Sequence, residues 1–154
     1  MSFHSHPPAS DAVNSHHIAA ERHNVAWVQR HSPGMAVDGD MLRRLQRTRF
    51  SRLAAFTYPR VGPDELALIT NWITWLFLHD DFYCDDNDAD EASLVTLHEG
   101  VLAVLRGERR PVVGDASLLH MLADLRRRML AWADLGWLSR FVVSVDRYLQ
   151  ATRW

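Results

Sequence analysis

The chain has 154 residues, of which 47% are hydrophobic and 23% charged, as in an ordinary globular domain. Its 17 basic and 19 acidic residues give a formal net charge of -2, which argues against a nucleic-acid partner because such proteins carry a basic excess. The single cysteine, Cys84, excludes an internal disulfide framework and fits a reducing cytoplasm. The most apolar stretch, residues 66–78, is too short to cross a bilayer. We therefore expect a cytoplasmic protein without a membrane span.

The chain divides into a short arm and a longer helical part. Residues 1–12 are polar and contain two adjacent prolines, so we predict a flexible N-terminal arm there. We predict that residues 13–154 form one α-helical domain, because apolar periodicity and helix-end signals recur throughout and no alternating strand pattern occurs. The predicted helices cover, in order, residues 18–30, 38–56, 63–83, 90–106, 115–132 and 136–154. The expected fold class is all-α, a helical bundle.

The third predicted helix, residues 63–83, leads to a group of acidic residues. It has an apolar stripe with steps of three and four residues: Leu66, Ile69, Ile73, Leu76 and Phe77. Its other faces are apolar as well, so we expect it to be buried nearly all round. The stripe continues to Asp80, while Asp81 follows Phe77 by one turn and Asp85 follows Asp81 by another. The carboxylates are therefore expected at the end of a buried helix, on its inward side.

Spacing alone leaves two interpretations of Asp80, Asp81 and Asp85 open. In one, they belong to a solvated acidic helix end. In the other, they bind a hard divalent cation, since carboxylates at the edge of an apolar core are costly unless a cation compensates them. Mg²⁺ suits such a site, because it accepts few carboxylates, keeps waters and takes phosphate oxygens of a substrate. A calcium-binding EF-hand loop starting at Asp86 is excluded, since Leu97 stands where a bidentate Glu is required.

The run WLFLHDDFYCDD, residues 75–86, resembles the Asp-rich motif of bacterial class I terpene synthases of the sesquiterpene cyclase kind. Residues 14–27 resemble the Asn-x-His segment and following Trp of that family, and RLQRTRFSRLAAFTYP, residues 44–59, resembles the helix before the motif. LRGERRP, DLRRRM and W-x-x-RF…YLQATRW resemble the segments that follow in order. The resemblance therefore covers nearly the whole chain after the arm.

This resemblance implies a helical bundle of the class I terpenoid synthase type around an apolar pocket. It implies Mg²⁺-dependent ionisation and cyclisation of a linear prenyl diphosphate, by family default farnesyl diphosphate, with release of diphosphate. Asp80 and Asp81 match the first two acids of the motif and are the expected catalytic metal ligands. Asp85 is the expected third ligand, in a DDxxxD spacing one residue longer than DDxxD. The expected pocket walls are three apolar side chains: Phe77, Ile73 and Phe56.

Members of this family are roughly twice as long, within the range of single domains. The chain lacks their second metal motif, N-x-x-x-S-x-x-x-E, their basic diphosphate sensor and their late Arg-Tyr pair. We therefore expect a truncated N-terminal half that is inactive or nearly so alone, with exposed apolar surface that drives aggregation or a homodimer. Two alternatives stay open: a non-catalytic helical binding or interaction protein derived from this fold, and an unrelated helical metal-binding protein.

Overall fold

The computed structural model describes residues 13–31, 39–83, 91–108 and 117–151. The expected arm, residues 1–12, lies outside these ranges, and so does Asp85. Within them the chain is all-α and contains no strand, which confirms the predicted fold class. No described helix is long and apolar enough to cross a membrane.

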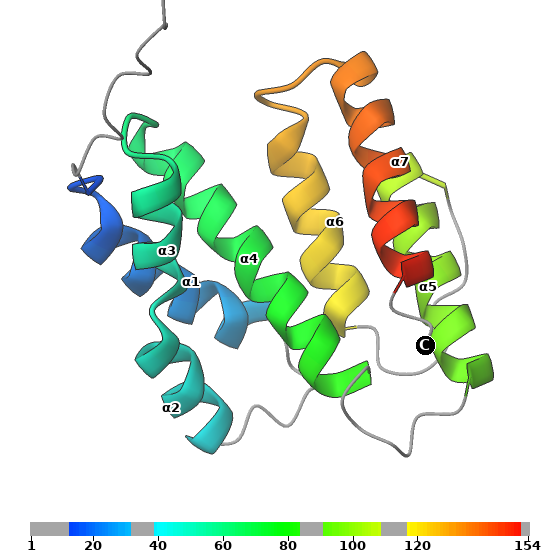
Figure 1. Cartoon of the computed structure of the whole chain (residues 1–154), viewed down its shortest axis with the longest axis horizontal. Coiled ribbons are helices and arrows are strands. Elements are labelled where there is room, and N and C mark those ends of the chain that lie inside the picture. The colour runs from blue at the N-terminus through cyan, green and yellow to red at the C-terminus, as the bar shows by residue number, and fades with distance from the viewer. Residues whose placement is uncertain (1–12, 32–38, 84–90, 109–116, 152–154) are drawn as a thin grey trace, which may run out of the picture.

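Seven helices occur in the described residues, with α4 at the centre of the bundle (Figure 1). They are α1 (His17–His31), α2 (Gly39–Thr48), α3 (Phe50–Thr57), α4 (Pro63–Tyr83), α5 (Glu91–Arg106), α6 (Ser117–Met129) and α7 (Leu135–Ala151). Helices α1 and α3 pack against one side of α4, and α6 packs against another side. Helix α5 packs against both α6 and α7.

The central helix begins where the sequence predicts, because local chemistry stops the helix from starting earlier. Pro63 is its first residue, a position at which the missing backbone N–H costs nothing. The Glu65 carboxylate reaches back and accepts a hydrogen bond of 2.6 Å from the Gly62 N–H, as in a capping box. Helix α7 is capped in a related way, since Asp134 Oδ1 accepts a bond of 2.7 Å from the Trp137 N–H.

The prediction of one helix over residues 38–56 is wrong at Arg49. This residue adopts a left-handed conformation, with φ of 51° and ψ of 58°, and separates α2 from α3. In an unbroken helix the face of Leu45 would continue to Arg49, whose charge cannot be buried without a partner. The break shifts the helical phase, and the buried positions become Met41, Leu45, Phe50, Ala54 and Ala55. Leu53 and Phe56, apolar residues of the same predicted helix, are exposed.

The face of α4 that is buried most deeply differs from the predicted stripe. The residues with no solvent exposure are Leu66, Thr70, Asn71, Thr74, Trp75, Leu78 and His79. Of the predicted stripe only Leu66 is among them, while Ile73 and Phe77 are half-buried. Hydrogen bonds make this burial tolerable, because Thr70 donates to the Leu66 carbonyl at 2.7 Å. One face of α4 is thus deeply buried and the opposite face is only partly covered.

A polar network crosses the core between α1, α4 and α6. Asn71 donates to the Asn24 Oδ1 at 2.8 Å and accepts from the Arg128 guanidinium at 2.7 Å. Trp27 Nε1 donates to the Asp124 carboxylate at 2.8 Å. Burial by itself raises the pKa of Asp124, but hydrogen bonds, with Trp27 as the principal donor, outweigh it and hold that pKa below its ordinary value. The network fixes the position of α4 relative to its neighbours.

Candidate active site

Asp80 lies near the C-terminal end of α4, and its side chain is 48% exposed. Its Oδ1 accepts a hydrogen bond of 2.5 Å from the Tyr148 hydroxyl, which comes from α7. The same Oδ1 lies 3.3 Å from the His79 Nδ1. Among the described residues no hydrogen bond reaches the second oxygen, Oδ2. The carboxylate is therefore held by one oxygen and leaves the other available.

Asp81 faces a different neighbour, as expected for consecutive residues on a helix. Both of its oxygens accept hydrogen bonds from the Arg44 guanidinium of α2, at 2.9 Å and 3.0 Å. The guanidinium also lies over the Phe77 ring, 5.5 Å from its centre, and Phe77 packs against Phe50 at 5.1 Å between ring centres. Arg44 thus compensates the charge of Asp81 and covers part of the neighbouring apolar wall.

Two histidines lie directly beneath Asp80, and neither is exposed. The His79 Nε2 is 3.3 Å from the His98 Nε2, and the two rings stack with their centres 5.3 Å apart. Burial lowers the pKa of His79, and this outweighs the opposing effect of the Asp80 carboxylate. We therefore assign a neutral ring, with its proton on Nδ1 because the Asp80 carboxylate can only accept. The Nε2 then accepts from His98.

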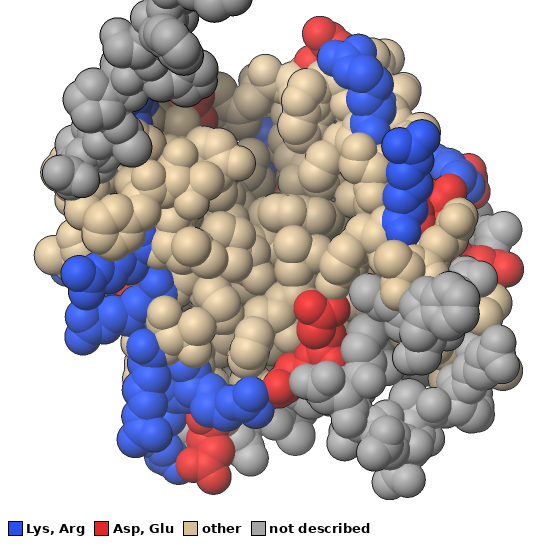
Figure 2. Space-filling model, viewed as in Figure 1, with Lys and Arg blue, Asp and Glu red and all other residues tan. Residues whose placement is uncertain are grey.

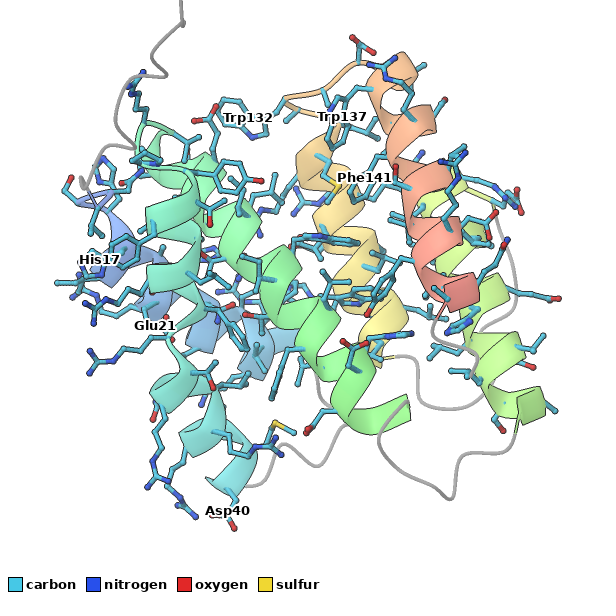
Figure 3. The ribbon with its side chains drawn as sticks, in the orientation of Figure 1. His17, Glu21, Asp40, Trp132, Trp137 and Phe141 are labelled. Atoms are coloured by element: carbon cyan, nitrogen blue, oxygen red, sulfur yellow. The ribbon has the colours of Figure 1, made fainter. Side chains whose placement is uncertain are left out.

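A column of aromatic rings leads from the end of the bundle where α6 turns into α7 down to this pair. Figure 3 shows Trp137 and Phe141 side by side on α7, and their rings stack at 5.1 Å between centres. Phe141 then meets Trp72 edge-on at 5.0 Å, Trp72 stacks on Trp75 at 5.3 Å, and Trp75 stacks on His79 at 5.5 Å. The column joins α7 to α4 and ends at the base of the carboxylate site.

The face of the molecule shown in Figure 2 is mostly uncharged over α4, with arginine side chains gathered at its edge over α2. Ile73 and Phe77 are half-buried and lie on the less covered face of α4. Phe56 does not join them: it is 49% exposed on α3, beneath the Arg52 guanidinium at 5.7 Å. No ring contact in the described part of the chain connects Phe56 with Phe77. The structure therefore brings two of the three predicted pocket residues together.

The sequence predicts the two carboxylates but not the side chains that form hydrogen bonds with Asp80. His79 and His98 carry no motif, and Tyr148 is 68 residues away from Asp80 along the chain. A signal for His79 exists in its position between Leu78 and Asp80 on an apolar helix, where a histidine is buried with the rest of its face. The Tyr148 contact depends on how α7 packs, which spacing does not reveal.

The donor set suits Mg²⁺ chemically, since carboxylate oxygens are its preferred protein ligands and it needs only one or two of them beside phosphates and water. The open Oδ2 of Asp80 meets this requirement directly. For Asp81 a cation has to compete with Arg44, because both carboxylate oxygens are hydrogen-bonded to it. The described residues contain no group of three or more His, Cys, Asp or Glu side chains that could hold a metal by themselves. The site therefore fits an ion that shares its coordination sphere with an anionic ligand.

The sequence of this chain is similar to those of known bacterial proteins. (+)-T-muurolol synthase of Roseiflexus castenholzii, named as cyclizing (2E,6E)-farnesyl diphosphate, is 36% identical over 149 residues, which is 96% of this chain and 44% of that protein. (-)-delta-cadinene synthase of Streptomyces clavuligerus is 30% identical over 142 residues, covering 90% of this chain and 42% of the relative. This chain spans less than half the length of these curated relatives.

A solved structure has the same fold. The SVS_A2 protein from ancestral sequence reconstruction matches 96% of this chain and 45% of its own with a TM-score of 0.84, at 23% identity. The fold is thus that of the class I terpenoid synthases, as predicted from the sequence. The family model described as terpene synthase family 2, C-terminal metal binding, matches residues 71–154, which include Asp80, Asp81 and the whole aromatic column. Since this match covers more than half of the chain, the protein belongs to the terpene synthase family.

Proposed function

We propose that this chain provides the first metal-binding wall of an enzyme that ionises and cyclises a linear prenyl diphosphate to a terpene, with farnesyl diphosphate as substrate. The observation that carries the proposal is the open Oδ2 of a half-exposed Asp80, next to the partly covered apolar face of Ile73 and Phe77. The names of the similar proteins support it, since one of them cyclizes farnesyl diphosphate.

In this proposal the carbon–oxygen bond of the substrate breaks heterolytically, and its electron pair leaves with the diphosphate. Bound Mg²⁺ supplies the positive charge that makes diphosphate a good leaving group. Asp80 and Asp81, near the end of α4, would hold the ion, with Asp85 as the third proposed ligand. Ile73 and Phe77 keep water away from the allylic cation, and nearby aromatic faces stabilise it.

We further propose that residues 1–154 alone turn over little or no substrate. The described residues offer only two carboxylates at the site, and one face of α4 is only partly covered. Exposed apolar side chains on α7 and in the turn before it support association of the isolated chain into a homodimer. The single cysteine supports a cytoplasmic location.

A chimera tests the proposal. Residues 1–154 replace the matching segment of (+)-T-muurolol synthase, and terpene products from farnesyl diphosphate are measured by gas chromatography with and without Mg²⁺. We expect Mg²⁺-dependent terpene formation, and a loss of about 100-fold or more in kcat for Asp80→Asn, since electrostatic stabilisation of the leaving group is lost. Asp40→Asn, at the start of α2, is the matched control and keeps full activity.

A second candidate is a non-catalytic helical binding protein that kept this fold. The Arg44–Asp81 pair favours it, because Arg44 compensates Asp81 without any metal. A soluble, folded chimera that makes no terpene, together with a chain that binds no Mn²⁺ in electron paramagnetic resonance titrations, would establish this candidate and refute the first. Mn²⁺ serves as the spectroscopic substitute for Mg²⁺ because both prefer oxygen ligands.

A further inference from the structure

The two oxygens of Asp80 differ in their surroundings. Oδ1 receives the Tyr148 hydroxyl at 2.5 Å and lies 3.3 Å from the His79 Nδ1. Oδ2 has no hydrogen bond to any described residue. A carboxylate that is free to rotate exchanges its two oxygens, so this asymmetry requires donors that are themselves fixed in place.

The first donor, His79, is fixed by its burial and its neighbours. Its ring has no solvent exposure and is stacked between Trp75, at 5.5 Å, and His98, at 5.3 Å between ring centres. Trp75 is anchored in turn, because its Nε1 donates to the Leu118 carbonyl of α6 at 2.9 Å. The His98 Nε2 faces the His79 Nε2 at 3.3 Å, which holds the His79 proton on Nδ1, opposite Asp80.

The second donor, Tyr148, comes from a different helix. Its ring is half-buried on α7 and lies 6.2 Å from the His79 ring, tilted by 53°. Next to it along α7, Leu149 and Val145 are buried in the core, so the helix cannot turn this face away without exposing them. The phenol therefore reaches Asp80 from a fixed position outside the helix that carries the acidic motif.

We propose that Tyr148 is a positioning residue for Asp80: together with His79 it holds Oδ1, so that Oδ2 is presented to a divalent cation. The part of this proposal that concerns the cation rests on the proposed function. Partners of this kind orient metal ligands and raise affinity, and removing them typically weakens metal binding about 10- to 100-fold. The hydroxyl, and not the ring, carries the effect.

The test uses the whole 154-residue chain and two readouts. The first is the side-chain rotamer of Asp80, measured by NMR through the three-bond couplings from its Cγ to the backbone nitrogen and carbonyl carbon. The second is the affinity for Mn²⁺, measured by electron paramagnetic resonance. Tyr148→Phe removes only the hydroxyl, and Tyr58→Phe, at an exposed tyrosine after α3, is the matched control. Far-UV circular dichroism verifies that each variant is folded.

We expect a single Asp80 rotamer in the wild-type chain and in Tyr58→Phe, and averaged couplings in Tyr148→Phe. We also expect Mn²⁺ to bind about 10-fold more weakly to Tyr148→Phe. Unchanged couplings in Tyr148→Phe would overturn the proposal, and so would averaged couplings with an unchanged affinity in a chain whose Asp80→Asn variant does lose Mn²⁺.

The failure of the proposed function gives a different result. If Asp80→Asn binds Mn²⁺ as the wild-type chain does, Asp80 is not a metal ligand and the proposed function loses its main support. The rotamer couplings still decide whether Tyr148 positions Asp80, because they need no metal. The two proposals therefore stand or fall on separate measurements.

Discussion

Asn71 connects three helices through one side chain, since its amide donates to Asn24 of α1 and accepts from Arg128 of α6. Replacement by leucine, Asn71→Leu, leaves the buried Asn24 amide and the largely buried Arg128 guanidinium without this partner. We expect a loss of about 2–4 kcal/mol in the free energy of unfolding, measured by urea denaturation with circular dichroism. Gln46→Leu, at an exposed position of α2, is the control and changes it by less than about 0.5 kcal/mol. Equal effects of both substitutions would contradict a structural role for the network.

Two histidines make the stability of the chain depend on pH. Burial lowers the pKa of His79 and, with help from Arg128, that of His23 below the ordinary value of 6.5. The unfolded chain therefore takes up protons first as the pH falls, so the free energy of unfolding is highest above pH 6.5 and decreases below it. Urea denaturation at a series of pH values measures this slope, which His79→Phe reduces. A slope in His79→Phe equal to that of the wild-type chain would exclude His79 as its source.

At the scale of helices, the break between α2 and α3 places Arg49 in a conformation that glycine adopts more easily. A residue with a side chain loses about 1–2 kcal/mol of stability in the left-handed region, and glycine avoids this loss. Glycine also has more conformational freedom in the unfolded chain, which offsets part of the gain. We expect Arg49→Gly to raise the free energy of unfolding by about 0.5–1 kcal/mol. Arg47→Gly, inside α2, lowers it by about 1 kcal/mol. Thermal unfolding of both variants measures the difference, and destabilisation by both would show that Arg49 is not strained.

The contact between α2 and α4 also sets how available Asp81 is. The Arg44 side chain is 54% exposed, so its pairing with Asp81 is worth no more than about 1 kcal/mol. Arg44→Gln removes a positive charge that competes with a cation, and we expect Mn²⁺ affinity to rise about 2- to 5-fold at low salt. Arg43→Gln, whose partner is Asp40, is the control with no such effect. A weaker Mn²⁺ affinity in Arg44→Gln would mean that Arg44 supports the site instead of competing for it.

Helix positions could be predicted from the sequence wherever a local signal exists. Pro63 starts α4 and Asp134 caps α7. Both effects act within a single helical turn, so the neighbouring residues are enough to predict them. The break at Arg49 could not be predicted, since no glycine or proline marks it and it serves to bring Phe50 into the core. The site follows the same division: Asp80 and Asp81 stand in a recognisable run, whereas Tyr148 reaches Asp80 only through the packing of α7.

At the scale of the whole molecule, large apolar side chains remain exposed at the end where α6 turns into α7 (Figure 3). Trp132 is 58% exposed, Leu135 70% and Trp137 40%. We expect the isolated chain to self-associate through this end, because burying two aromatic rings and a leucine is favourable. Sedimentation velocity measures the association, and the triple variant Trp132→Gln, Leu135→Gln and Trp137→Gln weakens it about 10-fold or more.

The control for self-association lies on a different helix, α1. Ile18 is 61% exposed on α1, so Ile18→Gln removes a similar exposed apolar side chain from a different surface. If the turn between α6 and α7 forms the interface, Ile18→Gln leaves the association constant unchanged. A monomeric wild-type chain at high concentration would show that these exposed side chains are tolerated in water, as isolated ones commonly are.

The aromatic column gives the molecule an optical property. Trp137, Trp72 and Trp75 are linked through near-contact rings to His79, with Trp72 and Trp75 stacked at an interplanar angle of 13°. Excitation energy passes between indoles this close together, so quenching of one of them lowers the emission of the others. The His79 ring at the end of the column is neutral until the pH falls below its lowered pKa, and a protonated imidazole quenches indole emission. The fluorescence of the unlabelled chain therefore reports the protonation of the ring beside Asp80.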